Sequence, residues 1–350
     1  SVTGVQTCAL PILQMVVPAR WGGSEASLSA VYDVIRTISM ACPSTGWIAA
    51  FYIMHNTYVA KFSERAQEEL FGAKGYVLLP SASAPNMSAH QVEGGWQVSG
   101  RAIWGSGIMH ADWVMMAGEA SDGPRAFLMP VADVEVLDTW HYTGMSGTGS
   151  ADYVAHEVFV PDHRSIPMAE FFSGVSEGTK AHENPIYSLP FFVAAFCTIV
   201  PVITGSYRGA VDAYQAIVER RTRNFTGTAV KDQQNAHIHL GDFQISAVVA
   251  EDLAKAIFDA VSETIGQREF TMEDRLLAKQ RTAFLSNMCR DAVNRMMTVS
   301  GSSSFHNDQP LQRIWRDMNT VCSHAFWDWD ITRELAGRQH LGLPMNFPLV

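Results

Sequence analysis

Short β-type runs lie between two helical regions of this sequence and decide its fold. They are Gly75-Tyr-Val-Leu-Leu, Trp96-Gln-Val-Ser, Ala111-Asp-Trp-Val-Met-Met, Ala126-Phe-Leu-Met-Pro, Val134-Glu-Val-Leu and His156-Glu-Val-Phe-Val-Pro. Turn residues separate them at Gly94-Gly95, Asp122-Gly123 and Pro161-Asp162. Strands this short and this regularly spaced predict a small β-barrel or sandwich over residues 74–165.

Helical patterns flank this β region. From Ser27 to about Phe71, apolar residues recur at helical spacing. After Pro190, four long helices are expected at residues 193–222, 232–265, 275–300 and 309–339, and the short breaks between them predict an antiparallel bundle. The predicted fold class is α+β and mostly α. It has N-terminal helices over residues 14–73, a middle β-barrel over 74–165 and a C-terminal four-helix bundle over 166–350.

Composition excludes several classes of protein. The chain has 350 residues, a formal net charge of −10 and 47% hydrophobic residues, so it is not disordered. The acidic balance argues against a nucleic-acid partner or an anionic membrane surface. Five scattered cysteines without a CxxC pair indicate a reducing cytoplasm and no metal site. The longest apolar run, about Leu189 to Ile203, is shorter than the roughly 20 residues of a membrane span.

The first thirteen residues differ from the rest of the sequence. They read Ser-Val-Thr-Gly-Val-Gln-Thr-Cys-Ala-Leu-Pro-Ile-Leu and have no basic region of the kind that begins a signal peptide. We expect residues 1–13 to be an artefactual segment and the native sequence to start at about residue 14.

Two glycine-rich stretches carry candidate ligand-binding hydroxyls. In Trp104-Gly-Ser-Gly, Ser106 is expected on a strand between glycines, which allow a flat ligand to approach the backbone. Its hydroxyl could then bond a ring nitrogen or its N–H. The alternative is a plain bulge or tight turn. In Gly144-Met-Ser-Gly-Thr-Gly-Ser, Thr148 and Ser150 could bond the polar edge of a ligand, or the stretch could be an ordinary surface loop.

Two further motifs lie in the predicted bundle. Leu311-Gln-Arg-Ile-Trp-Arg-Asp precedes His324, which stands among aromatic residues and is either a core histidine or a proton donor and acceptor. Arg220, Arg221 and Arg223 precede Phe225 and either complement a helix dipole or clamp a phosphate. The sequence has no GxSxG elbow, HExxH motif or P-loop.

The order of helices, barrel and bundle resembles the acyl-CoA dehydrogenase fold. The sequences of five segments resemble those of its flavin-dependent monooxygenase branch. This branch includes oxygenase components of two-component 4-hydroxyphenylacetate and steroid-phenol hydroxylases. These segments are Val17-Pro-Ala-Arg-Trp-Gly-Gly-Ser, Trp104-Gly-Ser-Gly, Gly147-Thr-Gly-Ser, Val158-Phe-Val-Pro and Leu311-Gln-Arg-Ile-Trp-Arg-Asp. The resemblance covers about Leu13 to Val350. Dehydrogenases commonly carry a catalytic glutamate in a Glu-Gly-Thr context, whereas this chain has His324 there, as the monooxygenases do.

The resemblance implies an activity and its cofactor. A separate NAD(P)H-flavin reductase would supply reduced FMN, with FAD as the alternative, and O₂ would form a C4a-hydroperoxyflavin that hydroxylates an aromatic or phenolic substrate. A dry pocket protects such an adduct. The family implies a homotetramer. It also has helices before Val17, so the N-terminal helical domain is expected to be truncated.

The resemblance also assigns residues. His324 would bond or protonate the peroxide and Ser106 would bond flavin N5, with Trp104, Thr148 and Ser150 beside the cofactor. The phosphate or ribityl chain would be held by Arg223, Gly301, Ser302 and Ser303, partly across a subunit interface. His55 and Ser81 would face the substrate, and Trp140 and Phe192 are apolar pocket candidates. The substrate itself and the choice of C-, N- or S-oxygenation stay open. Acyl-CoA dehydrogenation with FAD and a non-catalytic flavin-binding subunit are the alternative functions.

Overall fold

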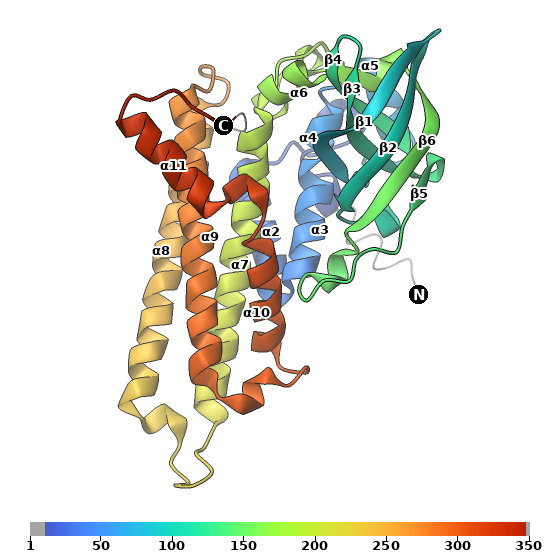
Figure 1. Ribbon diagram of the computed structural model, residues 1–350. Coiled ribbons are helices and arrows are strands. Elements are labelled where there is room, and N and C mark those ends of the chain that lie inside the picture. The colour runs from blue at the N-terminus through green and yellow to red at the C-terminus, as the bar shows by residue number, and fades with distance from the viewer. Residues whose placement is uncertain (1–10, 348–350) are drawn as a thin grey trace.

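The computed structural model describes residues 11–347 and has helices, then a curled sheet, then a helical bundle (Figure 1). This confirms the predicted fold class. Most of the segment expected to be artefactual, residues 1–10 with Cys8, lies outside the described residues. The main core already includes Met15, Val16 and Val17, which are buried.

Within the described residues, the N-terminal region contains the helices α2 (Leu28–Ala41), α3 (Pro43–Met54), α4 (Asn56–Val59) and α5 (Glu64–Phe71). Ser27 begins α2 by accepting the Ala30 N–H on its hydroxyl. Helix α3 reads Pro-Ser-Thr-Gly-Trp-Ile-Ala-Ala-Phe-Tyr-Ile-Met and is apolar on all faces, so it packs inside the protein between other elements.

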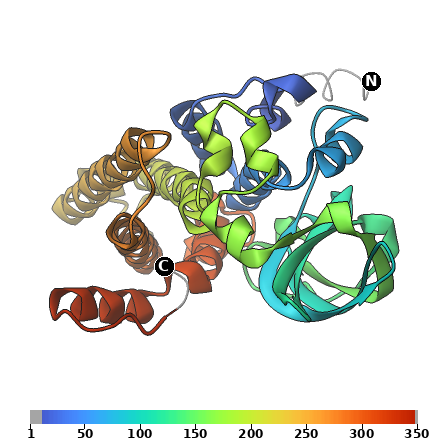
Figure 2. The same ribbon diagram turned by 90° about the horizontal axis from the view of Figure 1, so that it is seen from above.

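The middle region is one seven-stranded sheet. Its strands are β1 (Ser81–Val92), β2 (Gly95–Gly105), β3 (Trp113–Ala120), β4 (Gly123–Pro130), β5 (Val134–Val136), β6 (Ala151–Pro161) and β7 (Ser165–Pro167). They are ordered β5-β6-β2-β1-β3-β4-β7, and only the β1–β3 pair is parallel. Seen from above, the sheet curls round on itself (Figure 2). Its buried side chains, among them Trp96 and Phe127, form a core of their own. Among the described strands, the edges β5 and β7 do not pair, so the predicted barrel is open.

Two details of the β prediction are wrong. Gly75–Leu79 is not a strand: the Asp112 carboxylate accepts the Leu78 N–H at 3.0 Å, in place of a neighbouring strand. The first strand, β1, begins instead at Ser81. Its sequence starts Ser-Ala-Ser-Ala-Pro-Asn-Met, which has little alternation of polar and apolar residues. Ser106 does not lie on a strand, because β2 ends at Gly105.

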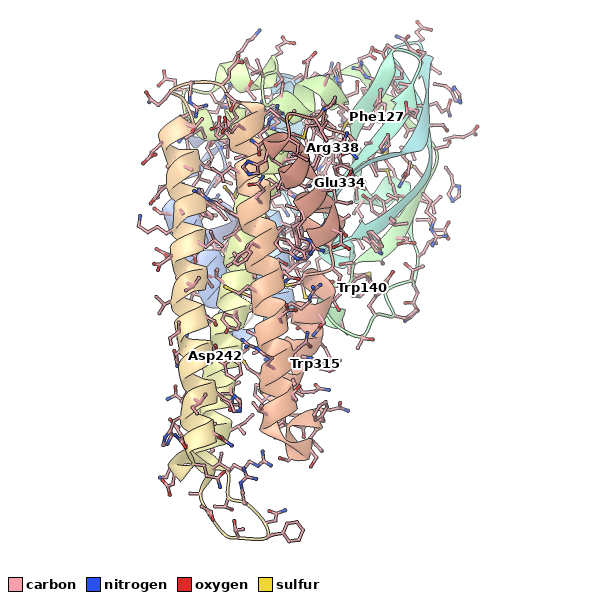
Figure 3. All side chains as sticks on the ribbon, turned by 60° about the vertical axis from the view of Figure 1, so that its left-hand side comes forward. Phe127, Trp140, Asp242, Trp315, Glu334 and Arg338 are labelled. Carbon is pink, nitrogen blue, oxygen red and sulfur yellow. The ribbon has the colours of Figure 1, made fainter. Side chains whose placement is uncertain are left out.

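The C-terminal region is a helical bundle. It consists of α7 (Phe191–Arg220), α8 (Gln234–Thr264), α9 (Met272–Ser300) and α10 (Pro310–Val321), with α6 (Met168–Ser173) before it and α11 (Trp329–His340) after it. Side chains join neighbouring helices: Arg295 of α9 pairs with Asp242 of α8 at 3.0 Å, and Trp315 of α10 donates to Asn294 of α9 at 2.6 Å. Figure 3 shows Asp242 and Trp315 on their helices. Single 3-10 turns connect the elements at 19–21, 108–110, 131–133, 146–148, 162–164, 178–181, 185–188, 230–232, 302–305 and 325–327.

The helix predicted at 309–339 is two helices. It breaks after Val321 because the His324 imidazole accepts the Phe326 N–H at 3.2 Å and closes a tight turn. Asp328 then caps α11 by accepting the Ile331 N–H at 2.9 Å. Helix α11 therefore leaves the bundle direction, as Figure 1 shows.

Among the described residues, α7 is long and apolar enough to cross a membrane by length and composition alone. However, 94% of its most apolar stretch is buried inside the protein. Helix α7 is therefore the central helix of the core, with α2, α3, α8, α9 and α10 packed round it.

Candidate active site

Ser106 occupies a tight turn after β2. The turn needs Gly107, whose φ is 83° and whose added Cβ would lie 2.6 Å from the Tyr52 hydroxyl. The Ser106 hydroxyl accepts the indole N–H of Trp47 at 3.0 Å and bonds the Ser150 hydroxyl at 2.9 Å. Its side chain is half-buried, so a ligand can still reach it.

The glycine-rich loop supplies Thr148 and Ser150. Their hydroxyls lie 2.6 Å apart, and Thr148 donates to the Met145 carbonyl at 2.8 Å. Both side chains are buried. Ser106, Ser150 and Thr148 therefore form one continuous row of hydroxyls, so this loop is not an ordinary surface loop.

The Arg-x-x-Arg-Asp part of α10 holds the glycine-rich loop in place. Asp317 accepts the Met145 N–H at 2.5 Å, and Arg316 donates to the Thr143 carbonyl at 2.8 Å. Gly144 allows this close approach, because an added Cβ would lie 2.1 Å from the Arg316 carbonyl oxygen. Burial raises the pKa of Asp317 above its usual value. The polar residues of this motif position the loop.

His324 lies in the turn between α10 and α11. Its ring stacks on Trp327, with centroids 4.6 Å apart, and lies 6.0 Å from the Trp47 ring. The half-buried imidazole is enclosed by aromatic rings, and this desolvation lowers its pKa to about 4. Since Nδ1 accepts the Phe326 N–H, the hydrogen-bond pattern assigns the proton of the neutral ring to Nε2.

His55, at the end of α3, has the opposite tautomer. Its Nδ1 lies 2.6 Å from the Leu79 carbonyl oxygen, which can only accept, so Nδ1 carries the proton and Nε2 is an acceptor. Burial lowers the pKa of His55 to about 4, so the ring is neutral near pH 7.

Aromatic rings connect the two histidines. His55 stacks on Tyr58 at 4.5 Å, and Tyr58 lies 5.4 Å from Phe191. Phe191 lies 5.8 Å from Phe326, whose ring is 4.8 Å from His324. The site therefore combines a hydroxyl row, an imidazole N–H and an imidazole acceptor with an apolar aromatic shell.

The remaining candidates lie on several different elements around the Ser106–His324 site. Phe192 packs against Phe326 at 5.5 Å, and Ser81 begins β1 in the extended chain that follows Leu79. Trp140 precedes the glycine-rich loop and contacts it, because its indole donates to the Met145 carbonyl at 3.0 Å. Trp104 is half-exposed and donates to the Tyr142 hydroxyl at 3.1 Å.

Four candidates lie away from this centre within one chain. Gly301, Ser302 and Ser303 precede the first residue of α10, whereas His324 follows its last. Twelve helical residues span about 18 Å. Arg223 lies in the exposed loop between α7 and α8 and donates to Gln233 at 2.8 Å. One chain does not bring these residues to His324.

Three buried residues of the site were not found from the sequence. Trp47 contacts both Ser106 and His324, but it stands in an evenly apolar helix that gives no sign of a role. Lys61 is buried and donates to the carbonyls of Phe171 and Leu189 at 3.0 and 2.8 Å. As a lone cation after a long apolar stretch, it could have been noticed.

Lys279 of α9 is the third of these residues. It is buried and donates to the Phe326 carbonyl at 2.8 Å, in the turn that carries His324. Burial lowers the pKa of both lysines, that of Lys61 to about 7 and that of Lys279 to about 8.

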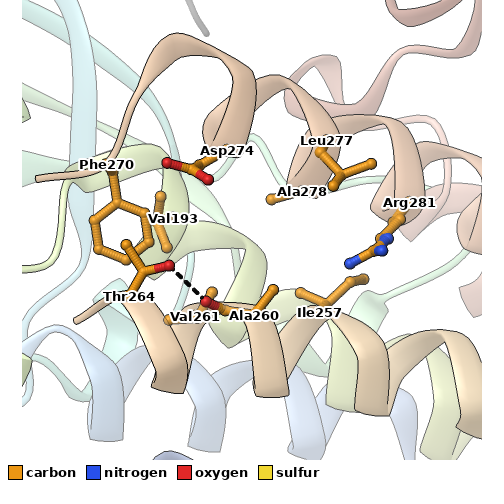
Figure 4. Close-up of a pocket in the computed structure, with 10 residues that line it drawn as sticks. All are labelled: Val193, Ile257, Ala260, Val261, Thr264, Phe270, Asp274, Leu277, Ala278 and Arg281. Carbon is orange, nitrogen blue, oxygen red and sulfur yellow. Dashed lines mark hydrogen bonds between the residues drawn. The ribbon is translucent and has the colours of Figure 1, made fainter. Parts of the chain in front are cut away.

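Two hollows outside this centre belong to the bundle. A cavity of about 40 Å³ lies between α8 and α9, with Asp274 and Arg281 among mostly apolar lining residues (Figure 4). An open groove of about 300 Å³ lies between α8, α9 and α11. Neither hollow is lined by Ser106, His55 or His324, so they are separate from the candidate site.

Several known proteins are similar to this chain. Residues 197–329 match the family model described as acyl-CoA dehydrogenase, C-terminal domain. A pigment production hydroxylase from Rhodococcus sp. is 38% identical and is aligned over 97% of this chain and 89% of that protein. The flavin-dependent monooxygenase oxygenase subunit HsaA from Rhodococcus jostii is 30% identical, over 96% and 90%.

The fold of this chain is also similar to that of a solved structure. XiaF from Streptomyces sp., in complex with FADH2 and glycerol, has a TM-score of 0.87 and 26% identity, over 97% of this chain and 88% of that chain. The fold, the aligned share of the chain and the sequence identity all point to the same family. This chain belongs to the flavin-dependent monooxygenases of the acyl-CoA dehydrogenase-like fold, as an oxygenase component of the two-component hydroxylase type.

Proposed function

We propose that this protein uses reduced FMN or FAD and O₂ to hydroxylate a phenolic substrate. The observation that carries the proposal is the pair of neutral imidazoles, one presenting an N–H and one presenting an acceptor, in one aromatic site with Ser106. One named relative is a hydroxylase and the other is a flavin-dependent monooxygenase, which favours monooxygenation over acyl-CoA dehydrogenation or a non-catalytic role.

The side chains fit a flat flavin ring. The half-buried Ser106 hydroxyl lies on a glycine turn, and the exposed apolar side chains of Trp104, Met109 and Tyr142 surround this turn and the adjacent loop. Bound there, the reduced flavin would supply the activated oxygen. Ser106 would bond N5 of the ring, with Thr148 and Ser150 behind it.

The two histidines would act on either side of the transferred oxygen. His324 would donate a hydrogen bond from Nε2–H to the oxygen, and His55 would accept a hydrogen bond from the substrate hydroxyl at Nε2. Both rings stay neutral near pH 7, because burial lowers each pKa to about 4. The surrounding rings, with Phe192, Trp140 and Ser81 at the edges, would exclude water and favour a planar aromatic substrate.

A second copy of the chain would complete the cofactor site. Arg223 and the Gly301–Ser303 turn are remote from His324 in one chain, yet they suit the flavin phosphate or ribityl chain. Phe225, beside Arg223, is fully exposed. A further exposed apolar stripe lies on α8: Ile238, Ile245, Val248 and Val249. These surfaces support a homotetramer in which one copy's loop reaches its neighbour's site.

Two further features belong to this proposal. A separate NAD(P)H-dependent reductase would supply the reduced flavin. The protein would work in the reducing cytoplasm, since Cys42, Cys197, Cys289 and Cys322, the cysteines within residues 11–347, are all free thiols.

The test compares His324→Ala with His90→Ala, a control at an exposed position on β1. Each protein is mixed with reduced FMN, O₂ and 4-hydroxyphenylacetate, and hydrogen peroxide and hydroxylated product are measured per flavin oxidised. We expect His324→Ala to release mostly peroxide, while His90→Ala matches the unmodified protein. Equal product yields from both variants would reject the role of His324.

A further inference from the structure

Lys61 ties together two distant points of the chain. This residue lies in the turn between α4 and α5 and is 1% exposed. Its amine donates to the carbonyl oxygen of Phe171 at 3.0 Å and to that of Leu189 at 2.8 Å. Phe171 belongs to α6, and Leu189 lies shortly before α7, so the amine joins both ends of the segment that connects these helices.

The connecting segment forms a compact loop over residues 174–188. Its ends are adjacent, because a Cβ on Gly174 would lie 2.4 Å from the carbonyl oxygen of Ser188. The loop also rests on the turn that carries Lys61, since the Ser176 hydroxyl donates to the Lys61 carbonyl at 2.7 Å. Compact loops whose ends lie close together are often functional. Lys61 thus holds this loop through both its amine and its carbonyl.

One end of the 174–188 loop leads directly to the aromatic ring between the two histidines of the site. Pro190, with a φ of −56°, connects Leu189 to Phe191, the first residue of α7. The Phe191 ring lies 5.4 Å from one ring that contacts a histidine and 5.8 Å from another, those of Tyr58 and Phe326. The Leu189 carbonyl, held by the buried amine, therefore fixes where the Phe191 ring lies.

The surroundings of the Lys61 amine are unfavourable for a cation. Within residues 11–347, no carboxylate forms an ion pair with it. The rings of Phe171 and Tyr58, with centroids 5.1 and 5.8 Å from Nζ, give it only a weak attraction. Burial of a charge without a counter-charge is costly, and an apolar side chain of this size would destabilise the fold less. What the amine adds is the pair of hydrogen bonds to the two ends of the loop.

We propose that Lys61 is a positioning residue for the aromatic substrate. By holding the carbonyls of Phe171 and Leu189, it fixes an aromatic wall formed by the Phe171 and Phe191 rings, whose centroids lie 5.5 Å apart. A substrate ring packed against this wall depends on where the wall lies. Bound flavin does not, because α10 holds the glycine-rich loop. The inference rests on the proposed function, because it takes an aromatic substrate and a flavin as the ligands.

The test separates substrate binding from flavin chemistry in Lys61→Met, whose side chain has a similar length but no N–H. Phenol, resorcinol and 4-hydroxyphenylacetate serve as probes, with reduced FMN and O₂. For each probe that the unmodified protein hydroxylates, we expect the KM to rise about tenfold, the effect of losing one hydrogen bond to a charged group. The dissociation constant of FMN and the rate of reduced-FMN oxidation without a probe should stay as in the unmodified protein.

Two further variants control this result. Lys180→Met makes the same substitution at an exposed lysine of the 174–188 loop and should leave all three quantities unchanged. Ser176→Ala removes the bond from the loop to the Lys61 carbonyl but keeps the buried amine. It should raise the KM several-fold, and it provides the test even if Lys61→Met does not fold.

Hydrogen–deuterium exchange over residues 172–190 reports on the loop without any ligand. It should become about tenfold faster in Lys61→Met and stay unchanged over residues 143–151. Faster exchange with an unchanged KM would leave Lys61 a purely structural role and overturn the proposal. Unchanged exchange over the loop, or an equal rise in the KM and in the FMN dissociation constant, would overturn it too. If the unmodified protein hydroxylates none of the probes, the proposed function fails and the substrate role of Lys61 fails with it, whereas the other outcomes reject the role of Lys61 alone.

Discussion

Replacing Asp317 with alanine should release the loop that carries Thr148 and Ser150. The carboxylate accepts the buried Met145 N–H at 2.5 Å, and Asp317 is 4% exposed. Alanine would leave this N–H without a partner inside the protein. An unpaired buried donor costs about 1–3 kcal/mol. Taking about 2 kcal/mol, the loop should open about 30 times more often, since 1.4 kcal/mol corresponds to a factor of ten.

Hydrogen–deuterium exchange over residues 143–151 measures this opening directly. The matched control is Asp317→Asn, whose amide oxygen can still accept the Met145 N–H and whose amino group can face Ser44. We expect about 30-fold faster exchange in Asp317→Ala and nearly unchanged exchange in Asp317→Asn. Slow exchange in Asp317→Ala, or equally fast exchange in both variants, would refute the assigned role of Asp317.

Three further predictions concern the same site. Lys279→Met removes the donor to the Phe326 carbonyl and should lower the product formed per reduced flavin several-fold, roughly the effect of one buried hydrogen bond. Lys279→Arg should lower it less, and chromatography of the products measures both. Gly144→Ala should lower the free energy of unfolding in urea by about 2 kcal/mol or more, because its Cβ would lie 2.1 Å from a carbonyl oxygen. Burial lowers the pKa of His55 and His324 to about 4, so the unfolded chain binds more protons than the folded protein between pH 6.5 and 4. The free energy of unfolding should therefore fall as the pH falls through this range. Urea unfolding at several pH values should show a weaker pH dependence in His55→Gln.

The sequence predicted the layered order because helical and strand periodicities differ clearly in most of the chain. Strand β1 was missed because its text is polar and its register depends on neighbouring strands. The break after Val321 was missed because the residues that follow do not break helices by propensity. That break depends on the His324 ring as a local acceptor and on the distant Lys279, which donates to the Phe326 carbonyl.

Glycines and hydroxyls made Ser106, Thr148 and Ser150 visible as candidates, but not their partners. Those partners include the Met145 carbonyl and the Trp47 indole, two groups far apart in sequence. The motif on α10 was noticed without its role, since its partners lie in other elements. Residue types indicate what can bind, and only tertiary contacts fix donors and acceptors.

Oxygen labelling tests the proposed monooxygenation most directly. The protein is mixed with reduced FMN and ¹⁸O₂ in the presence of phenol, resorcinol or 4-hydroxyphenylacetate, and the products are analysed by mass spectrometry. We predict a hydroxylated product carrying one ¹⁸O atom with at least one of these probes. Complete recovery of the label in hydrogen peroxide and water, with no labelled aromatic product from any probe, would contradict monooxygenation of a phenolic substrate.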